Sequence, residues 1–216
     1  MKKYLSIISI TLLSIATLFN CNDEDAAPKD YAASIKDKTW WGTLTNSGEA
    51  IQYYSVHFNA GNSLVWSQLS GDYLGQWSLD KNKLTITFTA PAVIVTTEIS
   101  DDNTWVNITT NTSNIVNSGE LVANPNITLD NTEWNGVDIS GGVTKSLKLI
   151  FTPNLEVSTV IDNKGAGGVP YNYTRLASGG AIRITAGYPY FGVITAGGEL
   201  RGSRQSYINS WQATKQ

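Results

Sequence analysis

The sequence predicts an all-β protein with antiparallel strands. Apolar and polar residues alternate along many short segments, and the plainest is 84–88, where Leu84, Ile86 and Phe88 share one face. The composition agrees with this pattern, because 19 glycines, 10 tyrosines and 7 tryptophans suit strands and tight turns. Only a few residues separate successive strands, and short connections join antiparallel neighbours. We therefore expect a meander, in which each strand pairs with the next along the chain.

The other elements follow from the same alternation. Strands are expected, in chain order, at 42–45, 53–58, 63–68, 75–79, 93–99, 104–109, 147–151, 155–161, 171–176, 181–184, 191–195 and 200–203. Turns are expected where residues that tolerate a positive φ gather, at 59–62, 80–83, 162–165 and 178–180. Apart from the N-terminal leader, only 30–36 resembles a helix.

Composition and charge exclude several classes of function. Hydrophobic residues make up 41% of the 216 residues and charged residues 15%, so the chain can fill a core and is not typical of a disordered protein. The formal net charge of -3 provides no basic face for phosphates, and we expect no nucleic-acid partner. Cys21 is the only cysteine, which excludes an intrachain disulfide framework and a cysteine-rich zinc site.

The first residues predict export and lipid attachment. Lys2 and Lys3 precede an apolar stretch at 4–19 that is too short for an ordinary membrane span, as in a signal peptide. Leu18-Phe19-Asn20-Cys21 resembles the lipobox of bacterial lipoproteins, which implies that Cys21 carries the lipid and becomes the first mature residue. The alternative is an ordinary secretory signal that happens to contain a cysteine.

An acidic run follows the cysteine. Asn22-Asp23-Glu24-Asp25 resembles the export signal that sends Bacteroidota lipoproteins to the outer face of the outer membrane. A solvated linker, with the protein on the periplasmic face, is the other interpretation. We expect a signal peptide at 1–20 and a linker at 21–36 that meets the outer membrane through its lipid.

The strand pattern occurs twice along the chain. Thr39-Trp40-Trp41-Gly42 opens the first half and Thr132-Glu133-Trp134-Asn135-Gly136 opens the second, each with Trp-x-Gly. Later landmarks keep the same order, pairing Val56-His57-Phe58 with Leu149-Ile150-Phe151, Trp77 with Tyr173, 84–87 with 181–184 and Ile99 with Ile194. We interpret the chain as a duplicated unit of about four or five strands, at 37–125 and at 126–216, as separate domains or one joint domain.

A meander of this length must cover its edge strands, and two architectures do so. Either the whole chain closes into one up-and-down barrel, or two small similar barrels or sheets pack as a sandwich. The Trp-x-Gly opening, with a short helix before it, resembles the start of a lipocalin-type barrel. The resemblance implies that the Trp packs across the closed end, that the Gly lets the strand bend, and that a ligand binds in the barrel.

No constellation of residues predicts catalysis. His57 is the only histidine and lies on the outer face of its strand, and there is no Gly-x-Ser-x-Gly motif. Five acidic residues could pair for glycoside hydrolysis but occupy no telling motif: Glu49, Asp72, Glu98, Glu133 and Glu199. Asp101-Asp102-Asn103 and Asp162-Asn163 match no recognised calcium loop. We expect a protein that is not an enzyme, with no catalytic residue, metal or cofactor.

Aromatic residues are the remaining candidates for function. Their number exceeds what a modest core needs, and aromatic rings serve both as apolar pocket walls and as platforms for sugars. The candidate binding residues are Trp66, Trp77, Tyr171, Tyr173, Tyr188 and Tyr190. We expect a binding protein for a small apolar or amphipathic ligand. The alternative is a cell-surface module that recognises glycan or protein through exposed aromatics, and a purely structural protein is a third reading.

Overall fold

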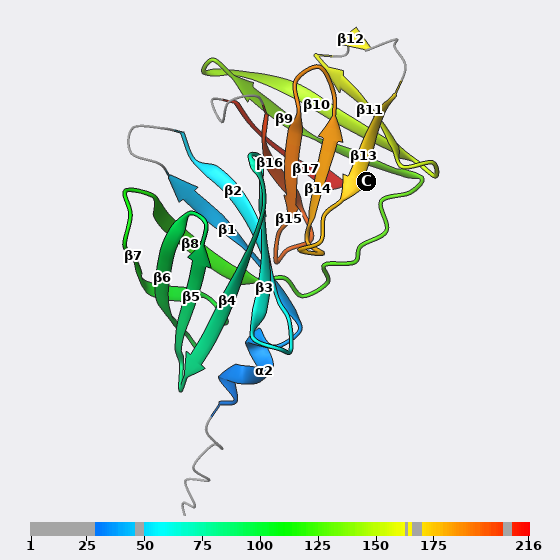
Figure 1. Cartoon of the computed structure of the whole chain (residues 1–216). Coiled ribbons are helices and arrows are strands. Elements are labelled where there is room, and N and C mark those ends of the chain that lie inside the picture. The colour runs from blue at the N-terminus through cyan, green and yellow to red at the C-terminus, as the bar shows by residue number, and fades with distance from the viewer. Residues whose placement is uncertain (1–28, 46–49, 163, 166–169, 205–208) are drawn as a thin grey trace, which may run out of the picture.

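The computed structural model describes residues 29–45, 50–162, 164–165, 170–204 and 209–216. It contains two antiparallel β-barrels side by side, which confirms the predicted all-β class (Figure 1). Cys21 and the acidic run lie outside the described residues, so lipid attachment stays a prediction. Within the described ranges, no helix is long and apolar enough to cross a membrane.

The first barrel follows a short helix. Helix α2 (Tyr31–Ile35) lies where a helix is expected, and the Asp30 carboxylate caps it by accepting the backbone N–H of Ala32 at 3.0 Å. Its eight strands are β1 (Lys38–Thr45), β2 (Gln52–Phe58), β3 (Ser63–Gln68), β4 (Gly71–Asp80), β5 (Lys83–Thr89), β6 (Ala92–Ile99), β7 (Trp105–Thr110) and β8 (Ile115–Leu121). Consecutive strands pair from β1 through β7, and β8 returns to pair with β1, so that β7 and β8 are the two edges of the sheet.

The second barrel repeats this order and is fully closed, because β10 pairs with both β9 and β11 and β17 pairs with β9. Its eight barrel strands are β9 (Thr132–Ser140), β10 (Val143–Thr152), β11 (Glu156–Ile161), β13 (Tyr171–Arg175), β14 (Ala181–Thr185), β15 (Tyr190–Ile194), β16 (Leu200–Arg204) and β17 (Asn209–Lys215). The two-residue β12 (Lys164–Gly165) adds to the end of β11.

Of the two predicted architectures, the structure has the one in which each half makes its own barrel. The repeated unit has eight strands, and the expectation of four or five was wrong. The alternation did not reveal the closing strands β8 and β17, nor β9, whose position only the Trp-x-Gly motif marked. β17 buries Trp211 and Ala213 alone among seven mostly polar residues, so its apolar signal is weak.

Strand register confirms the predicted repeat. Trp40 lies opposite Val56 in the first barrel, and Trp134 lies opposite Leu149 in the second, as the sequence correspondence requires. The predicted match of 84–87 with 181–184 is one residue out of step, because Trp77 faces Ile86 while Tyr173 faces Ile184. A shift of one residue in the pairing of two strands moves every side chain of the shifted strand to the other face of the sheet.

The same aromatic pair stands in both cores. The ring of Trp77 meets Phe58 edge to face at 5.9 Å, and the ring of Tyr173 meets Phe151 in the same way at 5.1 Å. Both pairs join the second and fourth strands of their barrels. Together with the register, this contact supports an internal repeat.

The Trp-x-Gly motifs close one end of each barrel. Trp40 and Trp134 are fully buried, and the indole N–H of Trp40 donates to the backbone oxygen of Ser34 in α2 at 3.0 Å. A Cβ at Gly136 would lie 1.9 Å from the backbone oxygen of Gln212. Glycine is therefore required because neighbouring strands approach so closely here.

The first barrel is closed by an aromatic ring more than by hydrogen bonds. Between β7 and β8, the isolated bridge Thr104–Glu120 and a bond from the Leu121 N–H to the Asn103 oxygen are the backbone pairings in the described residues. The ring of Trp105 covers this seam from inside, where a Cβ at Gly119 would lie 2.2 Å from it. Trp105 thus fills the gap that the ladder leaves.

The two barrels share an apolar interface. Strand β2 packs against β15 and β16, and Trp41 and Tyr53 on the outer face of the first barrel join the apolar cluster of the second. Every residue of β15 is buried, because one face lines its own barrel and the other meets the first barrel. This contact fixes how the barrels sit relative to each other.

Candidate functional site

Each barrel has a hollow at the end opposite its buried Trp-x-Gly tryptophan. Residues that line the hollows include Leu44, near the end of the first strand of its barrel, and Lys145, near the start of the second strand of its barrel. Figure 1 shows these strand ends on the side of each barrel that faces away from α2. The interiors below them are filled, since Trp40, Tyr54, Trp134 and Trp211 are among the fully buried side chains. Ligand space within the barrels is therefore found at the mouths. A separate hollow of about 310 Å³ is lined by 126–130, Leu155, Tyr173 and Arg175.

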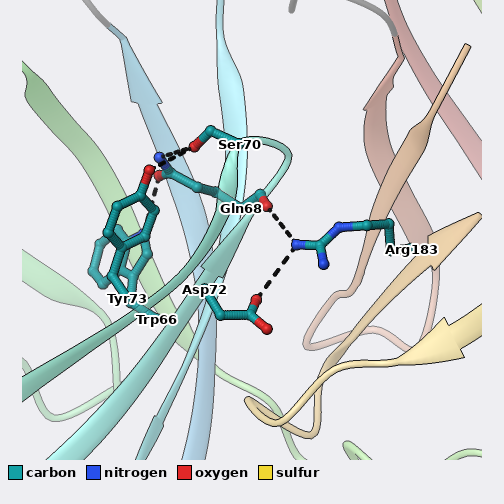
Figure 2. Close-up of polar contacts among 6 residues, drawn as sticks. All are labelled: Trp66, Gln68, Ser70, Asp72, Tyr73 and Arg183. Carbon is teal, nitrogen blue, oxygen red and sulfur yellow. Dashed lines mark hydrogen bonds and ion pairs between the residues drawn. The ribbon is translucent and has the colours of Figure 1, made fainter.

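The mouth of the first barrel is small and apolar. Its cavity has a volume of about 130 Å³ and includes Trp66, one of the predicted binding residues. The Trp66 indole N–H donates to the Gln68 side-chain oxygen at 3.2 Å, and the Gln68 amide donates to Ser70 Oγ at 2.7 Å (Figure 2). Ser70 Oγ lies 2.9 Å from Tyr73 Oη, which completes a hydrogen-bonded rim.

The second barrel holds this rim from outside. Figure 2 shows Arg183 reaching across from β14, where its Nη2 donates to the backbone oxygen of Gln68 at 3.2 Å and to the carboxylate of Asp72 at 3.4 Å. Both side chains of the ion pair are about one third exposed, so its contribution to stability is small. Its role is to fix the position of the β3–β4 hairpin.

The mouth of the second barrel is the larger site, with a cavity of about 610 Å³. This volume lies within the range of about 300–1,000 Å³ that is typical of small-molecule pockets. The predicted residues Tyr171, Tyr188 and Tyr190 all line it, together with Ile161 and Ala186. Tyr188 is 56% exposed and Tyr190 is 4% exposed, so the tyrosines run from the rim to the wall of the cavity.

A buried ion pair lies beneath this cavity. Asp138 is fully buried on the inner face of β9, and its Oδ1 accepts from Arg204 Nη2 at 3.2 Å and from Ser140 Oγ at 2.6 Å. Arg204 also donates to Ser140 Oγ and, through Nη1, to Tyr190 Oη at 3.4 Å. The guanidinium lies 5.5 Å from the centre of the Tyr190 ring, within cation–π distance.

Burial keeps the Tyr190 hydroxyl neutral. Burial raises the pKa of Tyr190 above its ordinary value, and the nearby Arg204 offsets only part of that rise. The neutral hydroxyl accepts from Arg204, and its own hydrogen has no acceptor among the described residues. A ligand in the mouth therefore meets a hydroxyl that can donate.

Lys145 is the second cation at the mouth. It lies directly opposite Asp138 in the β9–β10 ladder and, like Leu147 two residues later, faces inward. Its side chain lines the cavity and makes no hydrogen bond or ion pair within the described part of the chain. An ammonium that has no partner among the described residues thus faces the cavity.

The other predicted binding residues lie elsewhere. Trp77 is buried in the first core, where its indole N–H donates to the backbone oxygen of Asn59 at 3.1 Å. Tyr173 lies toward the closed end of the second barrel and donates to Asp130 at 2.8 Å. Burial, followed by this hydrogen bond, raises the pKa of Tyr173 to about 12.

His57 lies between the barrels and not at a mouth. The Thr39 hydroxyl donates to the Ser178 backbone oxygen at 3.1 Å, so its 3.0 Å contact with His57 Nδ1 requires that nitrogen to carry the hydrogen. Burial lowers the pKa of His57, which favours the neutral ring. His57 therefore contacts, through Thr39, the residues that join the two barrels.

Sequence reasoning missed the three charged residues of the second mouth. Asp138 lies four residues after Trp134, Lys145 two before Leu147, and Arg204 two after Gly202. Each thus shares the inner face of its strand with core residues. A charged residue on the apolar face, near the end of a strand, was the signal that could have found them.

In comparisons with known proteins, no protein-family model, curated protein or solved structure matches the chain.

Proposed function

We propose that the chain is a non-enzymatic binding protein that takes a small amphipathic ligand at the mouth of its second barrel. The observation that carries this proposal is the cavity of about 610 Å³, which is lined by three tyrosines together with Lys145 and Arg204. An apolar or aromatic body fits against the rings, and a polar group fits near the cations.

The packed interior favours an amphipathic ligand over a wholly apolar one. A lipocalin-type site for an apolar ligand needs empty space deep in the barrel, whereas Trp134, Phe151 and Trp211 are buried there. Charged groups at the mouth would lose hydration without compensation if a purely apolar molecule covered them. A ligand with a polar end avoids this cost.

A second candidate function is glycan recognition at the cell surface. Tyr188 favours it, because a ring that is 56% exposed at a rim can stack on a sugar face. Such a ligand would extend out of the mouth. Binding to immobilised oligosaccharides that is lost in Tyr188→Ala, without any small molecule retained in the cavity, would favour this function.

The proposal includes an outer-membrane location through lipid on Cys21, with display on the cell surface as the favoured face. The described chain enters at α2, beside the closed end of the first barrel, while both mouths open at the other end (Figure 1). An anchor that precedes α2 leaves the second mouth open to the medium.

Two variants test the location. Cys21→Ser should release the protein from membranes, and unchanged membrane association would contradict lipid attachment. Replacing Asp23, Glu24 and Asp25 with Ala should protect the protein from external protease in intact cells. Equal digestion of the parent and the variant would contradict the role of the acidic run in surface display.

Native mass spectrometry of the purified full chain tests the binding function. Ala186→Trp places a large ring in the cavity, and Ala92→Trp makes the same change at an exposed position of the first barrel. We expect a co-purifying small molecule on the parent and on Ala92→Trp, and none on Ala186→Trp. Retention by Ala186→Trp, or a bare mass for all three proteins, contradicts the proposal.

A further inference from the structure

We propose that the mouth of the second barrel selects ligands that carry a negative charge, and that Lys145 is the residue that binds this charge. The inference rests on the proposed function, because it names the class of ligand for the same cavity. The observation behind it is that Arg204 has partners within the protein, whereas Lys145 has none among the described residues.

Arg204 is already committed to the protein. Its guanidinium donates to Asp138 and Ser140 and reaches Tyr190 Oη at 3.4 Å, and its side chain is only 17% exposed. Asp138, which is fully buried, neutralises it. Arg204 therefore shapes the floor of the site and holds the Tyr190 ring in place.

Lys145 has no such partner. It stands opposite Asp138 in the ladder, yet the carboxylate lies with Arg204, and the ammonium is left at the cavity. Its three N–H groups have no acceptor within the described residues.

This mouth offers hydrogen-bond donors that have no acceptor among the described residues. The Lys145 ammonium and the Tyr190 hydroxyl can donate, and Asp162 is the one acidic residue among the described cavity-lining residues. Asp162 is exposed at the rim, and its Oδ1 accepts the Ser146 backbone N–H at 3.1 Å. A ligand with acceptor oxygens and a negative charge satisfies the donors that the protein leaves open.

The shape of the cavity gives the rest of the ligand class. Tyr171, Tyr188, Ile161 and Ala186 form an apolar wall beside the ammonium. The structure thus fits a carboxylate attached to a compact planar or apolar body. Three probes with one body and different charges separate charge recognition from contact with this wall: 2-naphthoate, its neutral isostere 2-naphthamide, and 2-naphthylmethylammonium.

Isothermal titration calorimetry on the full chain at pH 7.5 and low salt measures the three affinities. We expect 2-naphthoate to bind about fivefold more tightly than 2-naphthamide, as for one partly exposed ion pair, and the ammonium probe to bind most weakly. Lys145→Met should abolish the preference for 2-naphthoate over 2-naphthamide. Lys148→Met is the matched control, because this lysine lies on the outer face of the same strand and pairs with Glu133.

Each result decides between the two proposals. Equal binding of the three probes, or a preference that survives in Lys145→Met, overturns the charge selectivity and leaves the binding function standing. Failure of all three probes to bind at millimolar concentration overturns the binding function as well. Loss of the preference in Lys148→Met would also overturn the assignment, because a distant charge would then suffice.

Discussion

Asp138→Leu should destabilise the second barrel by about 3–5 kcal/mol. The carboxylate is fully buried and is the only acidic partner of Arg204 among the described residues. Leucine has a similar size but leaves the guanidinium in the barrel without a counter-ion. Removal of one member of a buried pair costs this much because the remaining charge stays desolvated.

The double variant Asp138→Leu with Arg204→Met separates the two contributions to this cost. It removes both charges and keeps apolar volume, and such replacements of buried ion pairs are often close to neutral. We therefore expect the double variant to recover most of the stability lost in Asp138→Leu. The difference measures the coupling between the two residues.

Urea unfolding followed by tryptophan fluorescence measures these free energies, since Trp211 lies opposite Asp138 in the ladder. Asp102→Leu is the control, because it removes an exposed carboxylate and should change stability by less than about 0.5 kcal/mol. If Asp138→Leu stays within about 1 kcal/mol of the parent, or if the double variant is as unstable as the single one, the reasoning about the buried pair is refuted.

Three further predictions concern packing, the interface and pH. Gly136→Ala should cost about 1–3 kcal/mol in thermal denaturation, whereas Gly187→Ala, where a Cβ meets nothing within 4 Å, should be nearly neutral; equal effects would contradict the packing argument. Arg183→Met should cost about 1 kcal/mol or less yet speed hydrogen exchange in 68–72, and unchanged exchange would show that the contact holds nothing. The neutral Tyr173 hydroxyl stabilises the fold fully below its ordinary pKa of 10, and this contribution is lost as pH rises through about 12. The melting temperature should therefore fall more steeply above pH 10 in the parent than in Tyr173→Phe, and identical slopes would contradict the assignment.

Alternation along the sequence was enough to predict most strands and the repeat. Leu84, Ile86 and Phe88 alternate with polar residues because one face of β5 is buried and the other is not. The closing strands β8 and β17 were not predicted, because each buries few side chains and its position depends on the strands that it pairs with. The number of barrels was left open because alternation is the same whether eight strands close or sixteen do.

The candidate site was half predictable. Tyr171, Tyr188 and Tyr190 were among the predicted binding residues, and all three line the mouth. The charged residues come from three different strands, so only the closure of the barrel brings them together. Their spacing in the sequence does not indicate this proximity.

The incomplete pairing between β7 and β8 makes the first barrel easier to open than the second. In the second barrel, every strand has a bonded neighbour on both sides. In the first, the part of β7 beyond Trp105 has a neighbour only in β6, and the ring of Trp105 stands in for the other. We expect the first barrel to open along this line, so a protease should cut between 106 and 114 before it cuts within the described strands of the second barrel.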